Sequence, residues 1–305
     1  MKIINGDYPF QLNGETAATI GFFDGVHTGH RFLLDQLKTD AEIHNLPSMA
    51  ITFIQHPKSV LQPGFQPKLL NTFDERLERL LQTGIDYCLL SDFTCTISQL
   101  SAKEFIQNTL KKDHYVKLLL IGYNHRFGKN RVESFEDYVK YGKECGMEIL
   151  RAEELPDISV SSTHIRNCLL KRNVKEASRM LSYCYRLEGI VIEGNRLGRT
   201  IGFPTANLEI TDKNKIIPGD GIYAVRVYRC GKKYGGMAYI GKRPTITIHG
   251  EKRIEVNLFD FSGNLYGETL RLEFVDFLRE DKHFENEEVL RQQLYADRES
   301  AVKVL

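Results

Sequence analysis

The chain has 305 residues, 42% of them hydrophobic, which is enough for about two domains with buried cores. Lysine and arginine total 41 against 40 aspartate and glutamate, so the net charge of +1 argues against a dedicated nucleic-acid binder. No apolar run approaches the ~20 residues of a membrane helix, and the first residues lack the apolar core of a secretory signal. Six cysteines are scattered without a Cys-x-x-Cys pair, as in proteins of a reducing compartment. We therefore expect a cytoplasmic protein with no nucleic-acid or membrane partner, present as a monomer or weak oligomer.

The first half of the chain, up to about residue 150, alternates short apolar runs with stretches of helical periodicity. The expected strands are 16–22, 49–54, 86–93, 116–122 and 147–155. The helix after the first strand is expected to bury one face, formed by Phe32, Leu33, Leu37 and Ala41. Two later helices open with a capping box, Thr72 with Glu75 and Ser101 with Glu104. Strands that alternate with helices predict βαβ units and a mostly parallel sheet in three layers.

The second half, from about residue 184, shows strand-length runs with period-two alternation, separated by glycine turns. This pattern is typical of a small antiparallel barrel or sandwich. The last residues, 285–305, have the pattern of one amphipathic helix with Asn286 as its N-cap. The second half is therefore predicted to be a small β-barrel with a C-terminal helix.

The change between the two patterns lies near residue 182. Two short helical stretches, 161–173 and 174–184, come at this point of the chain. We predict a Rossmann-like α/β domain over residues 1–182 and an antiparallel β-barrel domain over residues 183–305.

The stretch GFFDGVHTGH joins the first expected strand to the first expected helix. In a parallel α/β sheet, ligands bind outside the carboxyl ends of the strands, and a helix N-terminus there attracts anions. His27 and His30 are three residues apart and face one side of the first helical turn. Gly21 and Gly25, which flank Asp24, allow the backbone to approach a phosphate closely. We expect the imidazoles to stabilise ATP phosphates during attack at the α-phosphorus; a polar loop with solvated histidines is the alternative.

The stretch GNRLGRTIGFPTAN joins two strand-like runs through a glycine-rich loop that carries Arg196 and Arg199. Glycine N–H groups and arginine forks suit a triphosphate. Thr205 and Asn207 alternate along an extended segment and therefore face the same side. A hydroxyl and an amide oxygen are ligands suited to Mg²⁺. We expect a site for Mg²⁺ with ATP here; a turn followed by an ordinary barrel strand is the alternative.

The His-x-Gly-His motif at residues 27–30 resembles that of the nucleotidyltransferase superfamily. Nearly the whole chain resembles the prokaryotic bifunctional riboflavin kinase/FAD synthetase family, with its segments in the same order. In the first half these segments are TFIQHP, IGYNHRFGKNR and SSTHIR. In the second half they are GNRLGRTIGFPTANL, GIYAV, IGKRPT, EVNLFDFSGNLYG and FLREDKHF, and the PTAN run with its LGR lead-in is highly specific. The resemblance implies a nucleotidyltransferase domain followed by a riboflavin kinase barrel.

The resemblance also implies two ATP-dependent reactions. The second half would phosphorylate riboflavin to FMN and release ADP, and the first half would adenylylate FMN to FAD and release pyrophosphate. Glu255 would be the general base of the kinase, although by residue type alone it is a solvated strand position. Asn124 would join His27 and His30 in catalysis, and Arg279 would border the flavin. The implied nucleotide-binding residues are Gly21, Phe22, Asp24, Gly25, His56, Ser161, Ser162, Thr163 and Arg166 in the first half, and Gly194, Gly198 and Arg199 in the second.

Three residues of the first half depart from the family pattern. Gln55 stands in place of a proline, His125 in place of an aromatic residue and His164 in place of an arginine. Two alternatives therefore stay open: a flavin- or nucleotide-binding regulatory protein whose first half has lost turnover, and a nucleotidyltransferase for another phosphorylated acceptor. Release of pyrophosphate from ATP and FMN distinguishes the regulatory protein from an enzyme.

Overall fold

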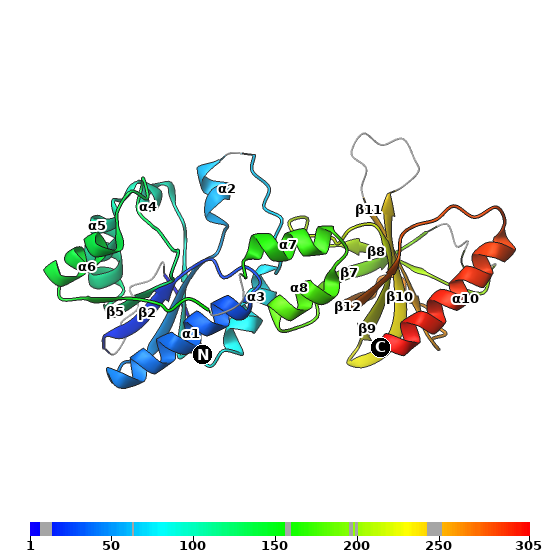
Figure 1. Cartoon of the computed structure of the whole chain (residues 1–305), viewed down its shortest axis with the longest axis horizontal. Coiled ribbons are helices and arrows are strands. Elements are labelled where there is room, and N and C mark those ends of the chain that lie inside the picture. Colours follow the sequence, from blue (N-terminus) through cyan, green and yellow to red (C-terminus); the bar gives the residue numbers. More distant parts are fainter. Residues whose placement is uncertain (7–13, 63, 156–159, 195–197, 199–200, 243–251) are drawn as a thin grey trace. The chain divides into compact units, whose positions relative to one another are not determined.

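The computed structural model describes residues 1–6, 14–62, 64–155, 160–194, 198, 201–242 and 252–305. These residues form two compact units, Met1–Ser161 and Ser162–Leu305 (Figure 1). The two units divide between Ser161 and Ser162, before the two short helices that join the halves of the chain. The boundary expected at residue 182 lies after these helices, where the strand pattern changes. The two short helices therefore fold with the second unit.

The first unit is built on a six-stranded sheet with the order β1-β4-β3-β2-β5-β6. Every pair of neighbouring strands is parallel. The strands are β1 (Lys2–Asn5), β2 (Thr16–Ile20), β3 (Ser48–Phe53), β4 (Tyr87–Ser91), β5 (Val116–Ile121) and β6 (Glu148–Arg151). The predicted parallel sheet is confirmed. Strand β1 lies outside the predicted set because four residues carry too little alternation to be recognised.

Helices connect these strands. They are α1 (Thr28–Ile43), α2 (Pro57–Leu61), α3 (Phe73–Leu81), α4 (Cys95–Gln99), α5 (Ala102–Glu104), the π-helix η1 (Phe105–Asp113) and α6 (Phe135–Glu144). Both predicted capping boxes are present, at the starts of α3 and α5. The helix expected to open with the capping box at Ser101 continues as a π-helix, with a hydrogen bond of 3.1 Å from the His114 N–H to the Thr109 carbonyl.

Helices cover both faces of the sheet, which gives the predicted three layers. Successive strand residues point to opposite faces, so Ala17 and Leu118 belong to one core, and Ala18 and Leu119 to the other. The first core is closed by α1 and α3, and the second by η1 and α6. The sheet therefore leaves its strand ends, rather than its faces, open to ligands.

Helix α1 follows its sequence pattern with one shift. Its fully buried side chains are Leu34, Leu37 and Ala41. Phe32 and Leu33, which were expected on the same face, are only partly buried. Leu34 lies three residues before Leu37 and fills the centre of the buried stripe, whereas Leu33 lies at its margin.

The second unit is a closed barrel preceded by two helices and followed by one. Its strand order is β10-β11-β8-β7-β12-β9, and every pair of neighbours is antiparallel. The strands are β7 (Arg186–Ile192), β8 (Ala206–Ile210), β9 (Gly221–Arg229), β10 (Lys232–Lys242), β11 (Lys252–Leu258) and β12 (Thr269–Arg279), and the helices are α7 (Ser162–Leu170), α8 (Val174–Leu181) and α10 (Glu287–Val304). The predicted barrel with a C-terminal helix is confirmed, and Asn286 caps α10 as expected.

A buried ion pair joins α10 to the barrel. Arg279, at the end of β12, donates through Nη2 to Oδ2 of Asp297 at 2.7 Å, and its Nε donates to the same carboxylate. The two side chains are 12% and 4% exposed. Around this pair, α10 packs its Ala301 against an apolar group that includes Phe203 and Phe259. The helix is therefore an integral part of the second unit.

Replacing Asp297 with alanine should leave the Arg279 guanidinium buried without its partner. Breaking a buried pair in this way typically costs about 3–5 kcal/mol, so the second unit of Asp297→Ala should unfold at a clearly lower urea concentration. Arg291→Ala is the control, because it removes an exposed pair with Glu288 that contributes at most about 1 kcal/mol. Urea unfolding followed by circular dichroism measures both, and equal losses would contradict the role given to Asp297.

Candidate active sites

Two histidines meet at the N-terminus of α1. His27 is the N-cap residue, and its Nδ1 accepts a hydrogen bond of 3.3 Å from the backbone N–H of His30. The two rings stack with their centroids 3.6 Å apart. Because Nδ1 of His27 is an acceptor, the neutral ring carries its proton on Nε2, which can donate. Two imidazoles thus lie side by side at the positive end of a helix dipole.

The loop before α1 has a strained backbone. Phe23, Gly25 and Val26 have φ values of 54°, 86° and 37°. A β-branched residue rarely adopts such a conformation, and each residue of this kind costs about 1–3 kcal/mol. Phe23 and Val26 are 2% and 0% exposed, so core packing holds the loop in this shape. The strain fixes the direction in which the chain reaches His27.

Asp24 ties the same loop to the segment before α3. Its carboxylate accepts hydrogen bonds from the backbone N–H of Leu70 at 2.9 Å and of Asn71 at 3.2 Å. The residue is 4% exposed. These contacts give Asp24 a positioning role in the loop, and its expected contact with a nucleotide stays a prediction.

Arg76 of α3 is a site residue that the sequence pattern did not reveal. Its Nη1 donates to the Phe22 carbonyl at 3.0 Å, and its Nη2 donates to the Phe53 carbonyl at 2.6 Å. The guanidinium lies 4.1 Å from the centroid of the Phe22 ring, and burial lowers the pKa of Arg76 to about 10. One arginine thus holds together the chain just beyond β2 and the end of β3. The only signal for it was its position four residues before Leu80, on the apolar side of the helix.

A cavity of about 440 Å³ opens at these strand ends. Four residues expected at the site line it: Gly21, Phe22, His56 and Asn124. Further apolar lining comes from Ile20, Phe53, Phe93, Leu100, Phe105 and Phe127, and positive charge from Lys58, Arg126, Lys129 and Arg131. His27 and His30 stand outside this lining. The first unit therefore has an apolar cavity with cationic groups and, separately, a histidine pair at a helix N-terminus.

His30 and His125 are neutral at pH 7. Burial lowers the pKa of His30 well below its usual value, and the neighbouring His27 and His125 lower it further. Burial also lowers the pKa of His125 to about 4, with the Arg131 charge as a second cause. Nδ1 of His30 is buried without a hydrogen-bond partner among the described residues. Because a nearby anion raises the pKa of a histidine, a bound polyphosphate would reverse these shifts.

Acidification should destabilise the first unit through His125. In the unfolded chain this histidine takes up a proton near pH 6.5, but in the folded unit only near pH 4. The unfolded state binds more protons between these values, so the contribution is complete above about pH 6.5 and is lost as the pH falls towards 4. His125→Phe should lower the slope of stability against pH by about 1.4 kcal/mol per pH unit in this range. Urea unfolding between about pH 7 and pH 5 measures it, and an unchanged slope would contradict a neutral His125.

The segment SSTHIR spans the division between the two units. Ser161 is the last residue of the first unit, and Ser162 begins α7 in the second. Thr163 and Arg166 follow on the same helix, as does His164, which departs from the family pattern. The expected contacts of these side chains with a nucleotide in the first unit stay a prediction.

The second site lies on the barrel strands β8 and β11. Asn207 of β8 stands opposite Glu255 of β11 in the antiparallel register, so the two side chains share a face. Oγ1 of Thr205 donates to Oε2 of Glu255 at 2.9 Å. The structure thus brings three expected site residues together.

Two glycines that precede β8 pack closely against their neighbours. A Cβ atom on Gly194 would lie 1.9 Å from Nδ2 of Asn207, so no larger residue fits. A Cβ atom on Gly198 would lie 2.2 Å from the Phe203 carbonyl oxygen. Arg199, expected to bind phosphate, lies outside the described residues. Gly194 therefore lets the backbone pack closely on Asn207, and Gly198 lets it pack closely on Phe203.

Arg253 completes the cluster and was not expected there. Its Nε lies 2.7 Å from Oε1 of Glu255 and 3.0 Å from Oδ1 of Asn207. The side chains of Arg253 and Glu255 are 23% and 20% exposed. The period-two spacing of Arg253 and Glu255 along β11 was the available signal, because it places both on one face of the strand.

The donor atoms of this cluster suit a hard cation. A hydroxyl, an amide oxygen and a carboxylate converge from Thr205, Asn207 and Glu255, and Mg²⁺ takes such oxygen ligands together with water and phosphate. The missing side chain of Gly194 keeps space beside Asn207. Across the described ranges, no group of three or more His, Cys, Asp or Glu side chains forms another candidate metal site. The residues fit Mg²⁺.

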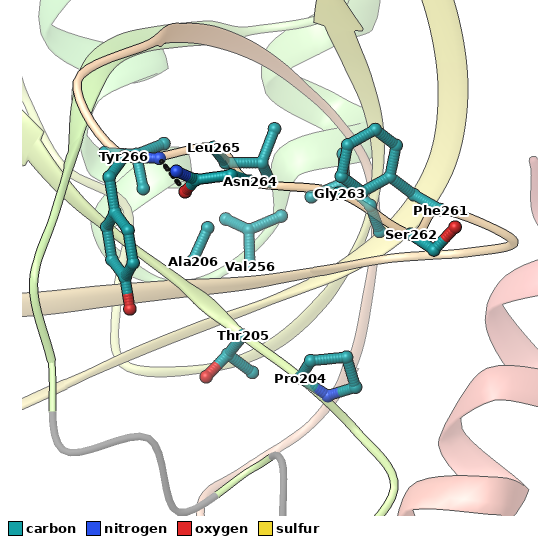
Figure 2. A pocket seen from close by; sticks show the side chains of 12 residues that line it. Pro204, Thr205, Ala206, Val256, Phe261, Ser262, Gly263, Asn264, Leu265 and Tyr266 are labelled. Atoms are coloured by element: carbon teal, nitrogen blue, oxygen red, sulfur yellow. Dashed lines mark hydrogen bonds between the residues drawn. The ribbon is translucent and has the colours of Figure 1, made fainter.

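A cavity of about 650 Å³ adjoins Thr205 (Figure 2). It is lined by Val191, Pro204, Thr205, Ala206, Val256, Leu258 and residues 261–266. In Figure 2, the loop with Asn264 and Tyr266 faces Ala206 and Val256, and the Asn264 side chain accepts a hydrogen bond of 3.1 Å from the Tyr266 N–H. Thr205 is the member of the oxygen cluster that lines this cavity, and a mostly apolar cavity with a few polar groups suits a ring system.

The guanidinium of Arg279, which was expected to border the flavin, forms an ion pair with the carboxylate of Asp297. Its Nη1 also donates to the carbonyl of Glu280 at 3.0 Å. The next residue, Asp281, accepts a hydrogen bond of 2.8 Å from the hydroxyl of Tyr239. The segment after β12 is thus fastened to the barrel, and a contact between Arg279 and flavin stays a prediction.

Two family models match the chain. One is described as FAD synthetase and matches residues 10–164, and the other is described as riboflavin kinase and matches residues 181–305. The first match contains the histidine pair and the 440 Å³ cavity. The second contains the cluster around Glu255.

Curated relatives match over nearly the whole chain. The bifunctional riboflavin kinase/FMN adenylyltransferase of Escherichia coli strain K12 is 34% identical over 302 residues, which cover 97% of this chain and 96% of the relative. The protein of the same name from Haemophilus influenzae is 36% identical over 289 residues, covering 93% and 92%. A crystal structure described as a macrolide-efflux protein from Streptococcus pneumoniae has a TM-score of 0.87 and 33% identity, with 99% of each chain covered. None of the helices described for this chain is long and apolar enough to cross a membrane.

Proposed function

The chain belongs to the family of bifunctional riboflavin kinase/FMN adenylyltransferases, and from this we propose how its two sites divide the two reactions. It phosphorylates riboflavin to FMN and adenylylates FMN to FAD, with ATP as co-substrate of both steps. The division rests on one observation: the histidine pair and the Glu255 cluster lie in different compact units. A cytoplasmic location suits ATP-dependent chemistry and six free cysteines.

In the first unit, His27 and His30 bind the phosphates of ATP at the N-terminus of α1. A phosphate oxygen of FMN attacks the α-phosphorus, the bond from that phosphorus to the bridging oxygen breaks, and pyrophosphate leaves with the electron pair. No protein nucleophile is needed, so the chain contributes positioning and donors aimed at the developing negative charge. Nε2–H of His27 is such a donor.

The flavin of FMN fits the 440 Å³ cavity of this unit. Phe22, Phe105 and Phe127 offer apolar and aromatic surface to the ring system, and Lys58 and Arg126 offer charge to its phosphate. Asn124 and His56 line the same space and can donate to the acceptor phosphate or to ATP. This assignment places the attacking group near the strand ends that carry the histidine loop.

In the second unit, Glu255 accepts the proton of the riboflavin 5′-hydroxyl. The hydroxyl oxygen attacks the γ-phosphorus, the bond to the bridging oxygen breaks, and ADP leaves. Thr205 orients the carboxylate through its hydrogen bond to Oε2, and the proton goes to Oε1, which Arg253 contacts at 2.7 Å in the structure. The 650 Å³ cavity beside Thr205 accommodates the base of ATP.

Thr205 and Asn207 would hold Mg²⁺ with the phosphates of ATP. The bound ion would neutralise negative charge on the β- and γ-phosphate oxygens during transfer. Gly194 brings its own backbone close to Asn207 and so to the same phosphates, since a side chain there would collide with Asn207.

Removing both imidazoles should separate the two reactions. One donor aimed at a developing oxyanion typically contributes about 10²–10³ in rate, so FAD formation should collapse when His27 and His30 are both replaced. His27→Asn with His30→Ala keeps an acceptor at the N-cap, and therefore tests the donor without removing the cap. Chromatography of riboflavin, FMN and FAD during incubation with MgATP measures the effect. FMN should accumulate; an undiminished FAD yield would return the histidines to an ordinary structural role.

Glu255→Gln should produce the opposite separation. The amide keeps the shape and an acceptor for Thr205 but cannot take up the proton, and a general base typically contributes about 10²–10⁴. Riboflavin phosphorylation should fall by that order, while FAD formation from supplied FMN should continue. The same product analysis, started once from riboflavin and once from FMN, measures both rates. Near-parent phosphorylation would rule out Glu255 as the base, and loss of both activities would rule out two independent sites.

A further inference from the structure

Arg253 already occupies the position next to the oxygen atoms assigned to the metal. Its Nε–H is shared between Oε1 of Glu255 at 2.7 Å and Oδ1 of Asn207 at 3.0 Å. Thr205 binds the other oxygen of Glu255. The cluster therefore already contains a cation, which is the guanidinium of its own chain.

This guanidinium and Mg²⁺ compete for Oδ1 of Asn207, the metal ligand that Arg253 already contacts. A magnesium ion binds oxygen at about 2.0–2.1 Å, so on Oδ1 of Asn207 it would stand within a few ångströms of the Arg253 charge. Like charges at that separation repel strongly in a partly desolvated site. Arginine does not lose its proton in proteins, so the repulsion can be relieved only by movement of the side chain.

The position of Arg253 allows such movement. Its side chain is 23% exposed, and its partners are the base and a metal ligand rather than the carbonyls of a closed core. Phosphate oxygens offer the planar fork an alternative partner once ATP is bound. Movement of Arg253 away from Glu255 would also free Oε1 of that carboxylate.

We propose that Arg253 is an internal cation that holds Asn207 and Glu255 until Mg²⁺ displaces it, and that it thereby sets the metal concentration that the kinase site requires. This proposal rests on the metal site assigned to Thr205 and Asn207 under the proposed function. Arg253 acts through these ligands and is a positioning residue. Its displacement links metal binding to release of the base.

Binding of Mn²⁺ to the nucleotide-free full-length protein tests the competition, with the free ion followed by its electron paramagnetic resonance signal. Mn²⁺ accepts the same oxygen ligands as Mg²⁺. Arg253→Gln removes the charge and should lower the dissociation constant about tenfold, the effect expected when one nearby like charge is removed. Arg253→Lys keeps the charge and should stay closer to the parent. Arg271→Gln is the matched control, because Arg271 pairs with Glu188 on an exposed part of the same barrel.

The Asn207→Ala substitution tests the metal site and the competition with Arg253 separately. In the Arg253→Gln background, Asn207→Ala should abolish the gain in Mn²⁺ affinity. If it leaves the gain intact, Mn²⁺ binds elsewhere and the metal site itself is misassigned. If Asn207→Ala weakens Mn²⁺ binding but Arg253→Gln binds no tighter than Arg271→Gln, the metal site stands and the competition is overturned. With riboflavin and ATP, Arg253→Gln should also reach half-maximal phosphorylation at a lower free Mg²⁺ concentration.

Discussion

Pairing between neighbouring strands decides which side chains meet at both sites. In the first unit, β2, β3 and β5 are parallel neighbours, so the segments that follow them end at one edge of the sheet. Gly21, His56 and Asn124 come from these three segments and line one cavity. In the second unit, the antiparallel register sets Asn207 opposite Glu255. A shift of one strand by one residue would turn one of these two side chains to the opposite face of the sheet. The backbone ladder therefore fixes each site before any substrate binds.

Parallel pairing brings the loops together, but it does not fix their shape. The loop from β2 to α1 contains Phe23 and Val26 in the left-handed region, which is unfavourable for both residues. Two buried polar contacts hold it there. The Asp24 carboxylate accepts hydrogen bonds from backbone N–H groups of the segment before α3, and Arg76 of α3 donates to the Phe22 carbonyl. Because both contacts lead to α3 or its entry, that helix supports the histidine loop although it lines neither the cavity nor the imidazole pair. The strain persists because buried groups on both sides of the loop would lose their partners if it relaxed.

The sequence determined the local features and left the long-range ones open. Capping boxes, the N-cap at Asn286 and the alternation of Thr205 with Asn207 depend on residues within a few positions of each other, and the structure contains all of them. Arg76 was missed because its partner Phe22 lies 54 residues away, and a single arginine carries no sign of a distant carbonyl. Arg253 binds Asn207, which lies 46 residues away, and its only local signal was its spacing from Glu255. The π-helix was missed for another reason, since its sequence has an ordinary amphipathic pattern and only the hydrogen-bond register differs. The cavities depend on several segments at once and have no local signal.

Arg76 and Arg253 differ in burial, and this difference decides whether a ligand can displace the guanidinium. Arg76 is 2% exposed and binds neutral carbonyl oxygens, so its charge is stabilised only while the loop and strand ends stay in place. Its removal from water is reflected in a pKa lowered to about 10, and any movement would leave buried carbonyls without donors. Arg253 is 23% exposed and binds a carboxylate and an amide that can be satisfied equally well by a metal ion and water. A ligand can therefore replace Arg253 without leaving a buried group unpaired, whereas no ligand can replace Arg76. Under the proposed division of the two reactions, the same residue type would therefore be a fixed support at the adenylyltransferase site and a displaceable counter-ion at the kinase site.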